Sequence, residues 1–314
     1  MKAVRFHEYG QPDVLRYEDV DQPVPSSGQV RVRVAATTFN GVEGNIRAGF
    51  MQGPMPLTLP HTPGLDVAGT IDAVGEDVDR FKAGDRVVGF LPFVDDGAAA
   101  EYVLAAADSL TAAPTTIPLA DAAALPLVGL TAWQALFDHA ELTAGQRILI
   151  SGAGGAVGGY AVQLAKAAGA YVVATASPRS AEHVRSAGAD EVIDHTTTDV
   201  AAVVTEPVDV LLNLAPIDPD AFKALASLVR DGGVVVSTTV WMPAPSDEKR
   251  GVRAVDLYVR NDPDQLSELV ARVDRGDLTV DVAERIQLTE LTSIHERAAA
   301  GSLSGKVVVL PTSA

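Results

Sequence analysis

Hydrophobic and polar residues alternate along 29–36, which predicts a half-buried strand early in the chain. Shorter apolar runs at 69–74 and 86–88 predict two more strands, and closely spaced glycines separate them. An Ala-rich segment follows, and 121–139 have the pattern of a helical stretch. The first third of the chain is therefore expected to form a compact β domain.

From Arg147 the pattern changes to alternating strands and helices, with apolar strands predicted at Arg147–Ser151 and Tyr171–Ser177. Further strands are predicted at 191–194, 208–213 and 233–238. Such alternation is typical of a doubly wound parallel sheet, which binds ligands at the carboxyl ends of its strands. In the tail we expect helices at 263–275 and 291–299. A last strand at 306–310 is expected to rejoin the N-terminal β domain.

A glycine-rich turn joins the strand at 147–151 to a predicted helix at 156–168. Gly152 and Gly155 carry no Cβ, so a pyrophosphate can approach the backbone there, and the helix N-terminus supplies amide donors. Gly158 is expected to let the helix pack closely on the strand. The G-x-G-x-x-G spacing is imperfect, because Ala153 replaces the first glycine. The turn predicts a dinucleotide site, and a tight turn without a ligand is the alternative.

The end of the second strand favours NADP(H) over NAD(H). An NAD site has an acidic residue there for the ribose 2′-hydroxyl, whereas the next acid in this chain is Glu182, inside the following helix. Ser177 can donate a hydrogen bond to a 2′-phosphate, and Arg179 can pair with it. The alternative is a plain helix start, with Ser177 as N-cap and Pro178 at the first helical position.

Length and composition narrow the classes of protein. The 314 residues suggest two domains, no apolar run is long enough for a membrane span, and the N-terminus has no signal-peptide pattern. We therefore expect a cytoplasmic protein that does not bind membranes. The absence of cysteine excludes disulfides, a thiol nucleophile and thiolate-bound zinc. A net charge of −17 argues against nucleic-acid binding and requires any NADPH site to be locally positive or rich in backbone donors.

Eight segments together resemble the medium-chain dehydrogenase/reductase superfamily, and within it the zinc-free quinone oxidoreductase branch. In chain order they are 38–47, 63–69, 73–75, 81–89, 99–103, 124–133, 152–166 and 305–308. The resemblance implies an α/β protein with a GroES-like β domain and a Rossmann doubly wound parallel-sheet domain, separated by a cleft. The GroES-like substrate domain would comprise 1–122 with 263–314, and the Rossmann NADP(H) domain 123–262.

The chain departs from the zinc enzymes of this superfamily at their metal site. They carry a His-Glu pair where this chain has Leu65-Asp66, and their cysteine ligands are missing. A site made of His61, Asp66 and Glu43 has a spacing that fits no known ligand pattern, so we expect no metal. Without a Lewis acid, hydride addition to a quinone or an enone is favoured, because these acceptors are already activated.

The resemblance implies substrate-cleft candidates at Asn40, Glu43, Asn45 and Arg47, and no certain catalytic side chain. As alternatives, Asn40 caps a turn, and Glu43 and Arg47 form an ordinary surface pair four residues apart. Asn45 stands where relatives have a tyrosine, which excludes a phenolic proton donor there. Cofactor contacts are expected at Asn40, Thr131, Ser151, Ala153, Gly155, Ala156, Val157, Gly158, Thr175, Ser177, Arg179, His195, Asn213, Leu214, Ala215, Ser237, Thr238 and Lys306.

Some of these cofactor candidates have ordinary alternatives. Thr131, which resembles a helix-start threonine near the nicotinamide ribose, could instead form a bond within its helix. His195 could be an exposed loop residue, and Lys306 could belong to a simple turn before a strand. Polar residues at strand ends, such as Asn213 and Ser237, are common in any protein.

The resulting hypothesis is an NADPH-dependent oxidoreductase that transfers hydride to a quinone or an α,β-unsaturated carbonyl without zinc. One alternative is an enoyl reductase for a specialised-metabolite or acyl intermediate. Another is a non-enzymatic NADPH-binding protein. The family also implies a homodimer, often formed through the last Rossmann strands, which would include 233–237 here.

Overall fold

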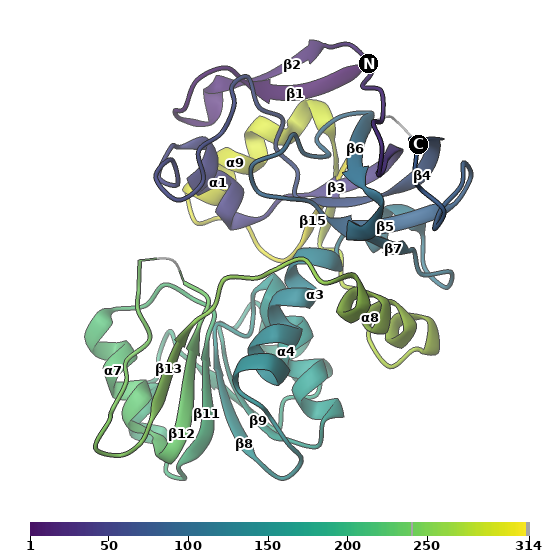
Figure 1. The fold of residues 1–314 in the computed structure, drawn as a ribbon. Helices are drawn as coiled ribbons and strands as arrows, with labels where there is room; N and C mark the ends of the chain where they lie inside the picture. The colour runs from purple at the N-terminus through teal and green to yellow at the C-terminus, as the bar shows by residue number, and fades with distance from the viewer. Residues whose placement is uncertain (240, 312–314) are drawn as a thin grey trace. The chain divides into compact units, whose positions relative to one another are not determined.

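The chain is divided into two units, each with its own sheet. The computed structural model describes residues 1–239 and 241–311. Unit 1 comprises Met1–Leu127 and Asn261–Ala314, and unit 2 comprises Val128–Arg260. The two sheets differ in strand direction (Figure 1), and the parallel sheet is in the part of the chain where the sequence pattern predicted one.

Unit 1 is built on a seven-stranded, mostly antiparallel sheet with the order β14-β15-β3-β4-β5-β7, in which β6 also pairs with β3. A separate antiparallel ribbon is formed by β1 (Lys2–Phe6) and β2 (Leu15–Asp19). The strands of the large sheet are β3 (Gln29–Thr38), β4 (Asp66–Val74), β5 (Arg86–Phe90), β6 (Tyr102–Ala106), β7 (Leu110–Ala112), β14 (Glu284–Gln287) and β15 (Val307–Leu310).

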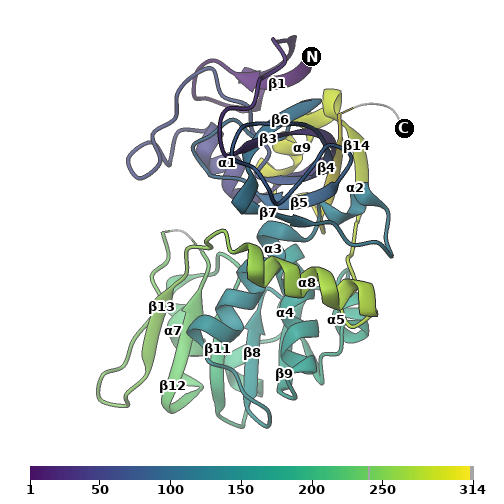
Figure 2. The same ribbon diagram turned by 45° about the vertical axis from the view of Figure 1, so that its right-hand side comes forward.

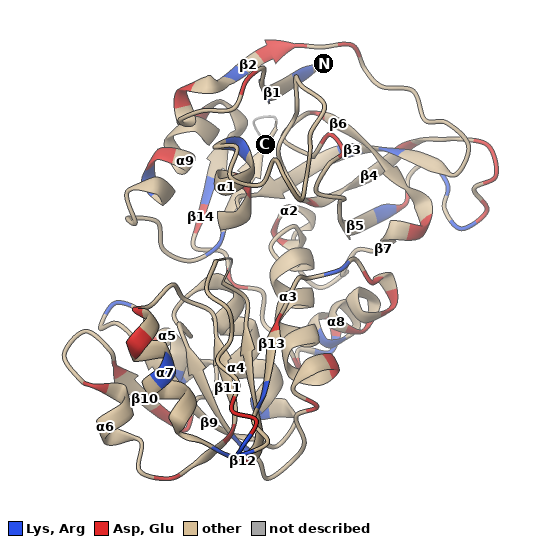
Figure 3. Ribbon diagram, turned by 60° about the vertical axis from the view of Figure 1, so that its left-hand side comes forward, with Lys and Arg blue, Asp and Glu red and all other residues tan. Residues whose placement is uncertain are grey.

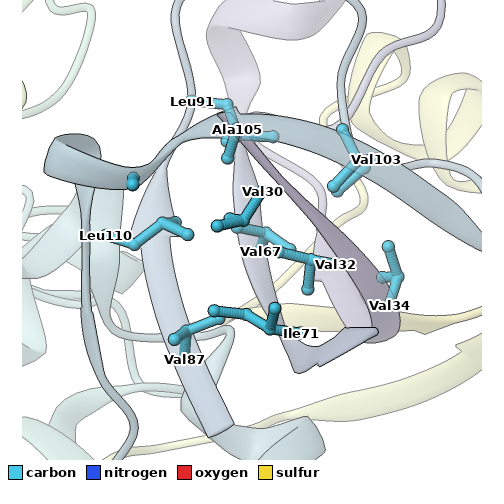
Figure 4. Close-up of a cluster of buried hydrophobic side chains, with 12 residues drawn as sticks. Val30, Val32, Val34, Val67, Ile71, Val87, Leu91, Val103, Ala105 and Leu110 are labelled. Carbon is cyan, nitrogen blue, oxygen red and sulfur yellow. The ribbon is translucent and has the colours of Figure 1, made fainter. Parts of the chain in front are cut away.

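The alternation that predicted a strand at 29–36 is seen in the core of this unit. Val30, Val32 and Val34 of β3 are buried on one side of the strand, and Figure 4 shows them grouped with valine, isoleucine and leucine side chains of neighbouring strands. The residues of β3 between them are more exposed. This is the period of two expected of a half-buried strand.

The last strand of the chain lies in the same sheet as the first third. In β15, Val308 and Val309 pair antiparallel with Thr38 and Thr37 at the end of β3. The prediction that this strand rejoins the N-terminal β domain is confirmed. Val308 and Thr38, about 270 positions apart in the sequence, are thereby held side by side.

The helices of unit 1 include two whose predicted bounds are confirmed. These are α8 (Pro263–Arg275) and α9 (Leu291–Ala299). The others are α1 (Gly41–Arg47) and α2 (Leu119–Ala122), with short 3₁₀ turns η1 (Pro12–Val14), η2 (Ala107–Ser109) and η4 (Leu288–Glu290).

The helical stretch predicted at 121–139 is not continuous. It is divided into α2, α3 (Pro126–Trp133) and a π-helical turn η3 (Gln134–His139). The break before Pro126 has a local cause, because proline disfavours helical backbone at the residue before it.

Unit 2 is a six-stranded parallel sheet with the order β10-β9-β8-β11-β12-β13. Figure 2 shows the sheet from a second angle. Its strands are β8 (Arg147–Ser151), β9 (Tyr171–Ala176), β10 (Glu191–Asp194), β11 (Val208–Asn213), β12 (Val229–Ser237) and β13 (Arg253–Asp256). Its helices are α4 (Ala156–Ala167), α5 (Ala181–Ser186), α6 (Val200–Val203) and α7 (Pro219–Ser227).

The strand order contains a switch point between β8 and β11. The chain runs outward from β8 through β9 to β10, then returns to the other side of β8 and continues to β13. Helices α4 and α7 consequently lie on opposite faces of the sheet (Figures 1 and 2). Ligands of doubly wound sheets bind at this kind of switch point, so the predicted α/β architecture places a site here.

Candidate functional site

The glycine turn is clamped to the end of β9. The amide of Gly152, at φ +83°, donates to the Thr175 hydroxyl at 3.0 Å, and the amide of Ala153 donates to the Thr175 carbonyl at 3.1 Å. A Cβ added at Gly152 would lie 2.8 Å from the Cβ of Ala215. Glycine is required at this position for both its backbone conformation and the lack of space.

Helix α4 begins directly behind this turn, with Gly155 as its N-cap residue. Within the described part of the chain, the amides of Ala156, Val157 and Gly158 donate to no protein acceptor. Three first-turn donors, aligned with the helix dipole, are the kind of groups that bind a phosphate in other proteins. The amides of Gly152 and Gly155 already donate, to the Thr175 hydroxyl and to the Gly152 carbonyl, so the helix supplies the free donors.

Gly158 lets helix α4 lie very close to the glycine turn that precedes it. A Cβ there would lie only 2.3 Å from the carbonyl oxygen of Ala153. At Gly158 the helix therefore packs directly on the backbone of the turn, and it also contacts β8 and β9. The distance between the turn and the three free amides depends on this glycine.

A cavity of about 360 Å³ opens at the carboxyl ends of β8, β9 and β11. Five of its lining residues were predicted to contact a cofactor: Ser151, Thr175, His195 and Ala215, with Gly152 of the turn. The remaining wall was not predicted and is partly apolar, with Pro216, Ile217, Val200, Ala201, Ala221, Ala224 and Leu225 beside Thr198 and Asp199. An apolar cavity of this kind suits a planar base.

Three polar residues lie in register at the ends of the central strands. Asn213 of β11 pairs with Ser151 of β8 and with Ser237 of β12. The Asn213 side chain is fully buried, and its Oδ1 has no hydrogen-bond partner among the described residues. The amide of Leu214 donates to the Ser151 carbonyl, and the amide of Thr238 donates to the Asn213 carbonyl, so hydrogen bonds link the ends of these strands.

The predicted 2′-phosphate residues are placed differently from a helix start. The carbonyl of Ser177 accepts from the amides of Ser180 and Ala181, both at 3.0 Å, and α5 begins only at Ala181 with Ser180 as N-cap. The alternative of Ser177 as N-cap and Pro178 at the first helical position is therefore wrong. A β-turn separates them from the helix and leaves Ser177 half-buried after β9.

Arg179 is exposed in this turn, and the described residues include no ion pair or hydrogen bond of its guanidinium. Ser180, which the sequence did not single out, lies beside the glycine turn, since a Cβ at Gly154 would be 2.2 Å from its hydroxyl. His195 is exposed after β10, as its loop alternative proposed, and also lines the cavity.

Charge along the parallel sheet is distributed unevenly. The central strands carry their charged residues near the amino ends, at Arg147, Asp209, Arg230 and Asp231. Their carboxyl ends are Ser151, Ala176, Asn213 and Ser237, all uncharged, and Figure 3 shows the middles of these strands mostly in tan. The rim that holds the cavity is thus free of carboxylates on the central strands, despite the net charge of −17.

Unit 1 contains a second polar cluster, around the buried carboxylate of Asp66. One carboxylate oxygen accepts from the amide of Leu127 at 2.7 Å. The other accepts from the Thr38 hydroxyl, from Asn40 Nδ2 at 2.9 Å and from Lys306 Nζ at 3.1 Å. Lys306 Nζ also donates to Asn40 Oδ1 at 2.5 Å. Lys306 is therefore part of a buried ion pair, although Gly305 before it does make a turn, at φ +71°.

Glu43 and Arg47 do not form the surface pair that their spacing suggested. Glu43 is buried, and its oxygens accept from the amides of Gly64, Leu65 and Asn40 at 2.6, 3.2 and 2.8 Å. Arg47 is also buried and donates to the Gly10 carbonyl and to His295 Nδ1. Residues four apart share one helix face, and in α1 this face is turned inward.

Burial determines the charge states in this unit. It raises the pKa of Glu43 to about 7, with the nearby Asp66 charge adding to the effect and the amide hydrogen bonds opposing it. Burial and the Arg47 charge lower the pKa of His295 to about 3, so this imidazole is neutral beside the guanidinium. Burial also lowers the pKa of His61.

Two further predicted residues lie inside helices. Asn45 is half-buried in α1, and its carbonyl accepts from the amide of Phe50 at 3.0 Å. Thr131 is buried at the sixth position of α3 and not at a helix start, because the helix already begins at Pro126. Thr131 is therefore not at a helix start in this chain, and its contact with a cofactor stays a prediction.

The comparisons with known proteins match both units. Residues 26–115 match the alcohol dehydrogenase GroES-like domain, and residues 187–309 match the zinc-binding dehydrogenase family. A chloroplastic quinone-oxidoreductase QR1 of Triphysaria versicolor is 32% identical over 99% of this chain and 98% of its own length. The quinone oxidoreductase of Homo sapiens is 32% identical with the same coverage. The chain belongs to the medium-chain dehydrogenase/reductase superfamily, in its zinc-free quinone oxidoreductase branch.

A solved structure supports this membership. The quinone oxidoreductase from Coxiella burnetii has a TM-score of 0.90 and 29% identity, with 99% of each chain covered. The antiparallel sheet of unit 1 is accordingly the GroES-like sheet of the superfamily, and the parallel sheet of unit 2 is its Rossmann-like sheet. Membership implies a nicotinamide cofactor, which the free amides of α4 and the unpartnered Asn213 Oδ1 fit.

A hydrogen-bonded cluster occupies the region of this chain that corresponds to the expected zinc site of the wider superfamily. Where the zinc enzymes have a His-Glu pair, Asp66 is occupied by four donors. Across residues 1–239 and 241–311, no group of three or more His, Cys, Asp or Glu side chains could hold a metal ion. Among these same residues, every helix is too short or too polar to cross a membrane.

Proposed function

We propose that this quinone oxidoreductase family member uses NADPH to reduce a quinone or an α,β-unsaturated carbonyl, without a metal. The proposal rests on two features found together: the free amides at the start of α4, and the absence of an acidic residue at the end of β9. The quinone oxidoreductases to which the chain is similar indicate the acceptor class. When bound, NADPH would supply the hydride, and the acceptor would take a proton from solvent.

In unit 2 each part of NADPH has a matching set of residues. The amides of Ala156, Val157 and Gly158 would bind the pyrophosphate. The 360 Å³ cavity, with its apolar wall, would hold the adenine. Ser177 and Arg179 would bind the 2′-phosphate, because the exposed guanidinium has no partner among the described residues that competes for it.

Unit 1 would serve as the substrate domain. Its candidates Asn40, Glu43, Asn45 and Arg47 remain predictions, as do the cofactor contacts of Asn40, Thr131 and Lys306. The ammonium group of Lys306, which donates to Asn40, would also bind an oxygen atom of the ligand. The role of the protein is to orient the reactants and exclude water, since a quinone or enone needs little further activation.

The test is NADPH oxidation, followed anaerobically at 340 nm with 1,4-benzoquinone and with a 2-alkenal, and repeated with NADH. We expect reduction with a strong preference for NADPH. Arg179→Ala should raise the KM for NADPH about tenfold or more and leave that for NADH unchanged, because it removes a charge-assisted pair with the phosphate.

Arg185→Ala is the matched control. Arg185 is an exposed arginine on the adjacent α5, where it pairs with Glu182 at 3.7 Å. Its loss should leave both cofactors unaffected. A preference for NADH, or equal effects of the two arginine variants, would contradict the proposed phosphate site. Binding of NADPH with no reduction of either acceptor would contradict the proposed reaction.

A homodimer and a cytoplasmic location are parts of the proposal that rest on the family and on composition. Residues 233–237, expected at the exposed edge, lie in β12 between β11 and β13, so that expectation is wrong. The edge strand is β13, and its free side could pair with a second copy. Sedimentation of the purified protein would test this, since a monomer at all concentrations contradicts the dimer.

A further inference from the structure

The carboxylate of Asp66 accepts hydrogen bonds from four residues, and it is inaccessible to solvent. Its four donors come from four separate places in the chain: the end of β3, the N-cap of α1, the second residue of α3 and the residue before β15. A buried carboxylate without a counter-charge is costly, and here the ammonium of Lys306 supplies that charge.

Asn40 and Lys306 are oriented through this carboxylate. Asn40 donates from Nδ2 to Asp66 and accepts at Oδ1 from Lys306, so the amide can point only one way. Lys306 uses two of its three N–H groups on Asn40 and Asp66. In the described part of the chain the third N–H has no acceptor. Its direction is fixed by the other two.

We propose that Asp66 is a positioning residue, which holds Asn40 and Lys306 so that the ammonium offers one N–H to an oxygen atom of the bound ligand. This inference rests on the proposed function, in which the Lys306 ammonium binds a ligand oxygen. The oxygen belongs either to NADPH or to the carbonyl of the acceptor. A donor fixed in advance loses little entropy when the ligand binds.

The test compares variants of the full chain in two measurements: NADPH binding by fluorescence titration, and the KM for 1,4-benzoquinone. Lys306→Met removes the donor and should weaken one of the two by about tenfold or more. Lys306→Arg keeps a cation and should restore most of the loss. Whichever constant changes identifies the ligand that carries the oxygen.

Asp66→Asn should give a loss similar to that of Lys306→Met, since Lys306 then loses its counter-charge and Asn40 loses the carboxylate that orients it. The double variant should be no worse than Lys306→Met alone, because both changes act through the same N–H. If the double variant shows the product of the losses of the two single variants, the proposal is wrong. So would a lower melting temperature with both ligand constants unchanged.

Two controls separate positioning from stability. Thr38→Val removes one donor to Asp66 but leaves Asn40 and Lys306 bonded, so it should lower the melting temperature without changing the ligand constants. Asp72→Asn changes an aspartate on the same strand β4 that pairs with Arg31 at 2.9 Å, and should change neither constant. If wild-type protein reduces no quinone, the proposed reaction fails, while the NADPH titration still tests Asp66.

Discussion

Two adjacent glycines of α4 should respond in opposite ways to the same substitution. In Gly158→Ala the new Cβ would lie 2.3 Å from the carbonyl oxygen of Ala153 and 2.5 Å from its carbonyl carbon, whereas ordinary contact begins near 3.4 Å. The obstacle is backbone and cannot rotate away. The start of the helix must therefore move outward by about 1 Å, since a hydrogen bond tolerates only a few tenths of an ångström.

This displacement would act on the proposed phosphate site. The free amides of Ala156, Val157 and Gly158 move with the helix, so their hydrogen bonds to a pyrophosphate would be stretched together. Loss of two charge-assisted bonds corresponds to an NADPH dissociation constant raised about a hundredfold or more. The overlap should also cost about 1–3 kcal/mol of stability, offset by about 1 kcal/mol from the better helix propensity of alanine.

Gly159→Ala is the control. Its Cβ would meet only Nε2 of His183, at 3.2 Å, and that exposed ring can move aside. We expect a melting temperature higher by about 2–4 °C and unchanged NADPH binding. Thermal unfolding and fluorescence titration measure both effects. A folded Gly158→Ala variant that binds NADPH like the wild type would refute the role given to the α4 amides.

Three further outcomes follow from single contacts. The pKa of Glu43 is raised from 4.5 to about 7, so the unfolded state releases this proton at lower pH than the folded state. The free energy of unfolding should therefore fall by up to about 3 kcal/mol as the pH rises through that range. Denaturant titrations at pH 5 and pH 8 should show this fall in the wild type and not in Glu43→Gln. Thr175→Val removes the acceptor of the Gly152 amide and should weaken NADPH binding several-fold, whereas Thr175→Ser keeps the hydroxyl and the affinity. Asp274→Ala removes the acceptor of the Thr116 amide at 3.0 Å, and thermal unfolding should show a melting temperature lower by at most a few degrees, with NADPH binding unchanged.

The elements predicted best are those whose start and stop signals are local. Helix α8 has Asp262 as an N-cap that accepts from the amide of Gln265, followed by Pro263, and it ends at Gly276 with φ +78°. All these residues are within the helix or next to it, so the sequence contains the full signal. Strand β13, by contrast, was not predicted, since its four residues include three that are exposed.

The Ser177-Pro178 pair shows how a correct local signal can be misplaced. Serine before proline is typical of a helix start, and a helix does follow, but it begins at Ala181. The reason is a competing turn, in which the Ser177 carbonyl accepts from the amide of Ser180. The sequence contains two serines that can cap this helix, and propensity alone does not choose between them.

Glu43 and Arg47 show a different limit. Their spacing correctly indicates a shared helix face, but it does not say whether that face meets water or protein. What decides is the set of partners for each side chain: Gly64 for the glutamate, and Gly10 and His295 for the arginine. These partners are distant in sequence, so the burial of the pair could not be predicted from α1 alone.

The same reasoning explains how an acidic chain can offer a site to an anionic cofactor. A count of −17 describes the whole surface, whereas binding depends on the field at one rim. At the central strands that rim carries no carboxylate, and in unit 1 the buried Asp66 is neutralised by Lys306. The lack of carboxylates at the rim could be predicted from the sequence, because the residues that end each strand can be predicted from it. The neutralisation of Asp66 by Lys306 could not, because these residues are 240 positions apart and come together through the pairing of β15 with β3.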